Sequence, residues 1–151
     1  MKKLFPSPKA RTLAVVFTVV LSTTIPGCKK QTTATENKME ILTAGTWRLT
    51  AFTIYTITGQ SDVYATYPDC RKDDYRHFNE GGTVEINEGP SQCNSTDPQS
   101  QSMQWKFLNQ YQTRIEINGE EYMVDRLENN EFRISTPSSA YSNQKVMLFN
   151  R

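Results

Sequence analysis

The chain has 151 residues, with 17 lysines and arginines, 16 aspartates and glutamates, one histidine and three cysteines. This length predicts a single domain with its own hydrophobic core. The formal charge of +1 excludes a strongly basic nucleic-acid-binding protein, and an apolar fraction of 36% is low for a globular protein but too high for a disordered chain.

Residues 1–27 have the organisation of an export signal. A basic start precedes a short apolar run, Leu13 to Leu21. A helix of this length reaches only ~14 Å, against ~30 Å for the hydrocarbon core of a bilayer, so no permanent transmembrane helix is expected. A positive flank, a short apolar run and a small residue are typical of a cleaved signal peptide. The positive charges are Lys2, Lys3, Lys9 and Arg11.

This segment ends in Ile25-Pro26-Gly27-Cys28, which resembles the lipobox of bacterial lipoproteins. The resemblance implies that the signal is cut before Cys28 and that the Cys28 sulfur carries a diacylglyceryl group. Two or three acyl chains make a stable membrane anchor, whereas one chain holds a protein only marginally. The alternative is a soluble secreted protein in which Cys28 is an ordinary residue.

Residues 28–38 are polar and lack apolar periodicity, which predicts a flexible tether. Lys29 stands where the best-studied bacteria use an aspartate to retain lipoproteins at the inner membrane. The acidic run that marks surface export in Bacteroidetes lipoproteins is also missing from this segment. By these resemblances we expect a cell-envelope lipoprotein of the outer membrane that faces the periplasm and contacts the membrane through its lipid.

The folded domain is expected over residues 39–151. Lys38 to Leu42 has the pattern of one or two helical turns, which Thr43-Ala44-Gly45 ends. Apolar residues then recur at every second position in short runs, the pattern of half-buried strands. A change of phase over Phe52 to Ile57 indicates a bulge or an exposed strand end. Strands are predicted within residues 47–57, 75–80, 83–88, 103–108, 115–117, 122–127, 131–135 and 146–149.

Turn residues separate these runs. Asn118-Gly119 is the strongest hairpin signal, and Gly81-Gly82 and Glu128 to Asn130 join further pairs of strands. Three longer segments, 59–69, 89–102 and 136–143, are predicted to be polar loops. Consecutive hairpins of this kind predict an antiparallel meander, whose open edges are removed when it closes. The fold class is therefore all-β, a single antiparallel up-and-down barrel of about eight strands with a short N-terminal helix.

Two of the three cysteines, Cys70 and Cys93, remain if Cys28 carries lipid. An oxidising compartment such as the periplasm favours a disulfide between them. The rival interpretation is a metal site, which needs further ligands, and the chain offers only His77 as a histidine.

Several motifs together resemble lipocalins. Gly45-Thr46-Trp47 matches the Gly-x-Trp of that family, in which the tryptophan plugs one end of the barrel. The order of Cys70, Asp73-Asp74, Phe78, Cys93 and Trp105 is similar to that of the lipocalin-like lipoproteins common in Bacteroidetes. The resemblance covers residues 42–149 and implies a fold and a cell-envelope location, but no activity.

No catalytic, metal or cofactor site is predicted. Asp73 and Asp74 are adjacent, so an extended backbone points them to opposite faces. We expect Asp73 to cap a turn and Asp74 to bond to backbone or arginine, with calcium binding together with Asp69 as the alternative. His77 alternates with Phe78 and is expected at the surface. The chain has no nucleophile elbow, phosphate-binding loop or dinucleotide fingerprint, and we expect no enzyme.

The inward aromatic residues are the remaining candidates. They either fill the core or line a pocket for a small hydrophobic ligand, because an eight-stranded barrel has room for one such molecule at most. Two functions stay open: a lipid-anchored barrel that binds a ligand, and a filled barrel that acts as a structural or protein-interaction module of the envelope, with an unknown partner. The candidate ligand-binding residues are Trp47, Phe78, Trp105, Phe107, Tyr122 and Phe132.

Overall fold

A computed structural model describes residues 37–138 and 143–151. The predicted signal peptide (1–27), the lipobox with Cys28 and the tether up to residue 36 lie outside the described residues. The expectations about export and lipidation therefore stay predictions.

The described residues form nine strands and three short helical segments. The helical segments are α1 (Lys38–Thr43), the 3-10 turn η1 (Tyr64–Thr66) and α2 (Asp69–Lys72). The strands are β1 (Thr46–Thr56), β2 (Gly59–Asp62), β3 (Tyr75–Phe78), β4 (Thr83–Asn87), β5 (Ser100–Phe107), β6 (Arg114–Ile117), β7 (Glu120–Leu127), β8 (Glu131–Ser135) and β9 (Gln144–Asn150).

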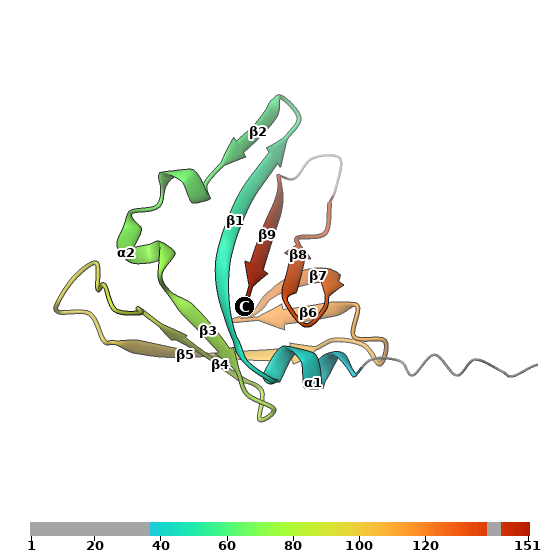
Figure 1. The fold of residues 1–151 in the computed structure, drawn as a ribbon. Coiled ribbons are helices and arrows are strands. Elements are labelled where there is room, and N and C mark those ends of the chain that lie inside the picture. Colours follow the sequence, from blue (N-terminus) through green and yellow to red (C-terminus); the bar gives the residue numbers. More distant parts are fainter. Residues whose placement is uncertain (1–36, 139–142) are drawn as a thin grey trace, which may run out of the picture. The chain divides into compact units, whose positions relative to one another are not determined.

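The sheet closes on itself through β1 (Figure 1). Strands β3 to β9 pair in chain order, each antiparallel to the next, and β1 pairs with β3 along one edge and with β9 along the other. Closure removes the free edges of the meander. The prediction of an all-β, antiparallel up-and-down barrel of about eight strands with a short N-terminal helix is confirmed.

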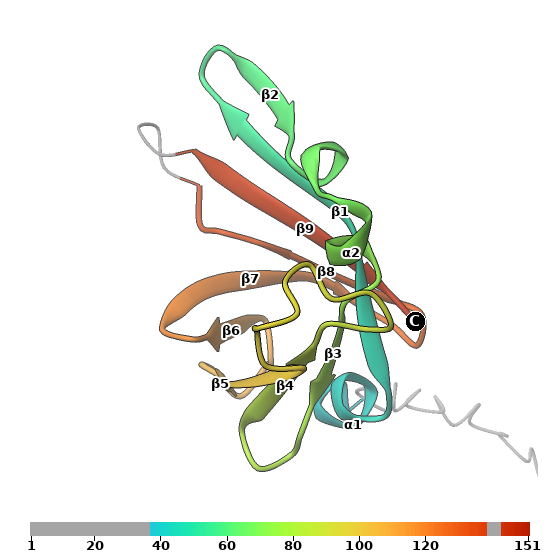
Figure 2. The same cartoon turned by 90° about the vertical axis from the view of Figure 1, so that its left-hand side faces the viewer.

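Strand β2 is an addition that the sequence did not predict. It lies inside the segment 59–69 expected as a polar loop and pairs with the end of β1, from Thr53↔Asp62 to Thr56↔Gly59. All four residues of β2 are exposed, so it carries no apolar alternation from which a strand could be inferred. The β1–β2 hairpin projects past the neighbouring strand β9 (Figure 2).

Turn chemistry agrees with the predicted hairpins. Asn118 and Gly119 connect β6 to β7 and both have positive φ, 52° and 82°, as a tight hairpin turn requires. The predicted irregularity of the first strand is a shift of register between Leu49 and Ala51, slightly earlier than the phase change suggested. The shift lets one long strand bend between its two partners.

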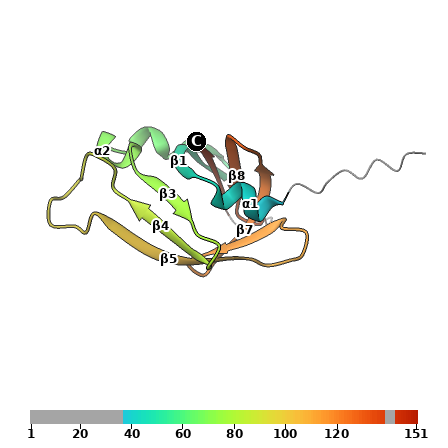
Figure 3. The same cartoon turned by 60° about the horizontal axis from the view of Figure 1, so that its bottom comes forward.

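Helix α1 covers one end of the barrel (Figure 3). The side chain of Asn37 caps its first turn by accepting a hydrogen bond from the amide of Met39. Leu42 is fully buried, and its carbonyl accepts a hydrogen bond of 2.9 Å from Nε1 of Trp47. The Arg151 guanidinium stacks over the Trp47 ring at 4.4 Å. We call this closed side of the barrel the α1 end and the opposite side the far end.

An aromatic cluster fills the barrel beside α1. Phe78 and Trp105 meet edge to face with ring centroids 5.4 Å apart, Trp47 and Phe132 are tilted at 5.7 Å, and Phe132 and Phe149 are stacked at 5.5 Å. Such contacts add to the area that the rings bury. This half of the interior is a packed core. The cluster comprises Trp47, Phe78, Trp105, Phe132 and Phe149.

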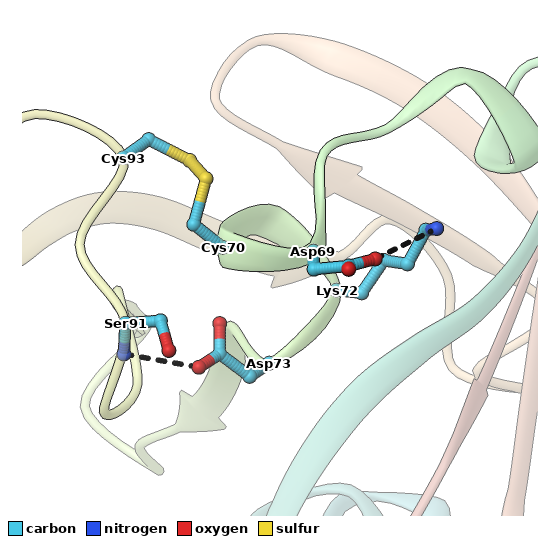
Figure 4. The surroundings of a disulfide bond; sticks show 6 residues. All are labelled: Asp69, Cys70, Lys72, Asp73, Ser91 and Cys93. Atoms are coloured by element: carbon cyan, nitrogen blue, oxygen red, sulfur yellow. Dashed lines mark hydrogen bonds and ion pairs between the residues drawn. A yellow bond between two sulfur atoms is a disulfide. The ribbon is translucent and has the colours of Figure 1, made fainter.

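A disulfide joins Cys70 of α2 to Cys93 of the loop between β4 and β5 (Figure 4). The disulfide alternative is therefore the one that the structure adopts. Asp73 follows α2 and ties down the same loop, because its Oδ2 accepts a 3.0 Å hydrogen bond from the amide of Ser91. A Cβ at Gly89 would lie 2.6 Å from the Asp73 carbonyl oxygen, so this close approach requires glycine.

The bridge closes a loop of 23 positions, for which chain entropy predicts a contribution of about 3 kcal/mol to the free energy of unfolding. The Cys70→Ser/Cys93→Ser double variant should lose this amount in a urea titration. Reducing agent should lower the stability of the parent chain equally and leave the double variant unchanged. A parent chain whose unfolding curve ignores the reducing agent would contradict the prediction.

Candidate functional site

A partly open cavity of about 150 Å³ lies inside the barrel, between the aromatic cluster and the far end. Phe78 and Phe149 form its boundary toward the aromatic cluster, and apolar side chains of four strands, β4, β6, β8 and β9, form its walls. Only two polar side chains, Arg76 and Tyr122, reach it. The aliphatic lining is Val84, Ile86, Ile117, Ile134 and Met147.

Only two of the six predicted ligand-binding residues, Phe78 and Tyr122, line this cavity. Trp47 and Phe132 are fully buried in the aromatic cluster and belong to the core. Trp105 and Phe107 line a separate, open groove of about 280 Å³ at the α1 end, together with Met39 of α1. The prediction that all six residues point inward does not tell apart the cavity, the aromatic core and the open groove.

Arg76 is the functional candidate that the sequence did not single out. Its neighbours across the strand pairs are Trp47 on β1 and Ile86 on β4, both of which point into the barrel. Alternation along β3 therefore places Arg76 on the same inner face as the fully buried Phe78. The guanidinium stacks over the Phe149 ring at 5.2 Å.

The Arg76 guanidinium is incompletely partnered. Its Nη1 is buried and has no hydrogen-bond partner within the described parts of the chain. Burial lowers the pKa of Arg76, and the charge of Asp74 opposes that shift. The Arg76 side chain nevertheless stays protonated near neutral pH, because guanidinium is an exceptionally weak acid.

Asp74 precedes β3 and is the carboxylate whose charge acts on Arg76, but the two side chains form no ion pair within 4.0 Å in the described structure. Burial raises the pKa of Asp74, the charge of Glu88 adds to this rise, and Arg76 opposes it. The Oδ1 atom of Asp74 is also buried without a hydrogen-bond partner. The hydrogen bond to backbone or arginine expected for Asp74 is not seen for this oxygen.

A hydrogen-bonded group of three residues stands beyond the cavity toward the far end. The Tyr122 hydroxyl donates to Oε2 of Glu120 at 2.7 Å, and Nζ of Lys145 donates to Oε1 of the same carboxylate at 2.5 Å. Burial, and then the hydrogen bond to Glu120, raises the pKa of Tyr122. The carboxylate of Glu120 is therefore compensated by neighbours at the rim of the barrel.

His77 lies on the outer face, as its alternation with Phe78 predicts. It is half-buried, because its ring nitrogen Nδ1 lies 3.2 Å from the carbonyl oxygen of Gly45 and donates to it. Within residues 37–138 and 143–151, no group of three or more side chains that could hold a metal ion occurs around it.

A larger depression of about 550 Å³ lies on the outside of the barrel beside β1. Its lining includes Arg48, Tyr75 and Arg151, which lie on the outer face or at the chain end. It is open to solvent and no aliphatic side chain lines it, so the smaller interior cavity is the better candidate for an apolar ligand.

Comparisons with known proteins add no relative. No protein-family model matches the chain, and no curated protein sequence matches it. Within the described residues, no helix has the length and apolar character needed to cross a bilayer. Function is therefore inferred from the geometry and chemistry of the site.

Glu120 provides a pH test of the rim. The hydrogen bonds from Lys145 and Tyr122 lower the pKa of Glu120 below its ordinary value of 4.5. A lowered pKa means stabilisation that is present above about pH 4.5 and lost as the pH falls through the pKa of the folded state. We expect Glu120→Gln to melt below the parent chain at pH 7, and the gap to close toward pH 3.

The matched control is Glu80→Gln, a substitution at an exposed turn residue. This variant should melt like the parent chain at neutral pH. A gap for Glu120→Gln that is unchanged between pH 7 and pH 3 would show that the charge of Glu120 is not what stabilises the rim.

Proposed function

We propose that the chain is a lipid-anchored envelope protein whose barrel binds a small hydrophobic ligand. The observation that carries the proposal is the cavity of about 150 Å³ inside the barrel, whose walls are mostly apolar side chains. An empty cavity of roughly this size in a protein core can hold a molecule such as benzene. It lies below the usual range of drug-sized sites, so the ligand is small.

Export to an oxidising compartment is supported by two independent features. The Cys70–Cys93 disulfide is of a kind that persists outside the reducing cytosol. The segment ending in Gly27-Cys28 has the order of a signal peptide with a lipobox. Lipid on Cys28 would hold the barrel near the outer membrane by a short polar tether.

The alternative is a filled barrel that docks a protein partner of the envelope. The packed aromatic half of the interior favours it, as do two exposed apolar side chains of the β1–β2 hairpin, Tyr55 at 43% and Ile57 at 94% exposure. Two side chains make too small a patch for a stable interface. The cavity therefore carries more weight.

Ligand binding is tested with toluene as the probe, followed by backbone amide NMR shifts. We expect saturable shifts for residues that surround the cavity, such as Ile117 and Met147. Ile86→Trp fills part of the cavity and should abolish saturation. Ile57→Trp adds the same ring at an exposed turn and should behave like the parent chain. Equal titration curves for the parent chain and Ile86→Trp would contradict binding in the cavity.

Lipidation is tested on full-length chain expressed in a bacterium with the lipoprotein pathway. We expect mass spectrometry to find a diacylated N-terminal Cys28 and the protein to partition into detergent. Cys28→Ser should stay in the aqueous phase, whereas Cys93→Ser should keep its lipid. An unmodified N-terminus that begins after Cys28 would refute the anchor.

A further inference from the structure

Arg76 places a positive charge inside a cavity that is otherwise apolar. Its Nη1 atom is buried and lacks a hydrogen-bond partner among the described residues, and the side chain forms part of the cavity lining. A buried cation without a hydrogen-bonded counter-charge is costly, and proteins retain such groups chiefly at functional sites. Packing alone therefore does not explain why a charged residue occupies position 76.

The surroundings compensate Arg76 only in part. The Phe149 ring at 5.2 Å offers a cation–π contact but no hydrogen-bond acceptor. Glu120, at the rim, already accepts hydrogen bonds from Lys145 and Tyr122. Asp74 acts on Arg76 through its charge, without an ion pair within 4.0 Å among the described residues. Nη1 of Arg76 is therefore a buried donor without an acceptor among the described residues.

We propose that Arg76 is the counter-ion of the bound ligand, and that this ligand is a small carboxylic acid, bound as the monoanion with its hydrocarbon part in the apolar cavity. The inference rests on the proposed ligand-binding function and names the chemical class of the ligand. The planar guanidinium fork matches a carboxylate in geometry. A single guanidinium compensates a single negative charge.

The charges around Arg76 and the volume of the cavity restrict the range of possible ligands further. Asp74 contributes negative potential at Arg76, which disfavours a ligand with two negative charges. The volume of about 150 Å³ fits one aromatic ring or a short aliphatic chain, not a long acyl chain. Benzoate has this combination of one carboxylate and one ring, and benzamide is its uncharged counterpart of nearly the same shape.

The experiment is a calorimetric or NMR titration of the full barrel with benzoate and with benzamide. We expect the parent chain to bind benzoate more tightly than benzamide by about tenfold or more, since hydrogen bonds to charged groups are the stronger kind. Arg76→Met keeps the length of the side chain but removes its charge. It should lose the preference for benzoate and keep its affinity for benzamide.

The matched control is Arg48→Met, because Arg48 lies on the outer face of the same β1–β3 pair, directly across from Tyr75. It should bind both probes as the parent chain does. Asp74→Asn gives a second test that leaves Arg76 in place. Removal of the competing negative charge should tighten benzoate binding several-fold and leave benzamide binding unchanged.

The outcomes separate the two proposals. Equal affinity of the parent chain for benzoate and benzamide, unchanged benzoate binding in Arg76→Met, or weaker benzoate binding in Asp74→Asn would each overturn the role of Arg76 and leave cavity binding intact. Failure of the parent chain to bind benzoate, benzamide and toluene alike would overturn both proposals.

Discussion

Pairing of β1 with both β3 and β9 is the constraint on which the rest of the structure depends. Once the sheet is closed, the alternation along each strand decides whether a side chain points into the barrel or toward solvent. The register shift between Leu49 and Ala51 bends β1 so that one strand serves both neighbours. Trp47, at the start of this strand, fixes α1 over one end through its hydrogen bond to Leu42.

Closure divides the interior into two unequal parts. Beside α1, large rings such as Phe78 and Phe132 fill the space and supply the buried apolar area that stabilises the fold. Further along the barrel the inward residues are smaller, and a cavity of about 150 Å³ remains. Arg76 lies on the inner face here because β3 alternates, and the hydrogen-bonded group around Glu120 stands beyond it at the rim.

The sequence predicted the features that follow from local chemistry. The alternating runs, the Asn118-Gly119 turn and the pairing of Cys70 with Cys93 all appear in the structure. Strand β2 was missed because its residues are all exposed and its hydrogen bonds to β1 leave no apolar pattern. Arg76 was missed because a charged residue in a half-buried strand is ordinarily assigned to the surface. Its phase relative to Phe78 was the available signal.

On this proposal, the charge of Arg76 is retained for a ligand and lowers the stability of the barrel when no ligand is bound. The most direct measurement compares the free energy of unfolding of the parent chain and Arg76→Met in urea, without ligand. Replacement of this buried and only partly compensated charge by an apolar side chain of similar length should stabilise the barrel, by about 1 kcal/mol or more. A variant that is less stable by about 3 kcal/mol would show that Arg76 is a satisfied structural residue, and would contradict the account.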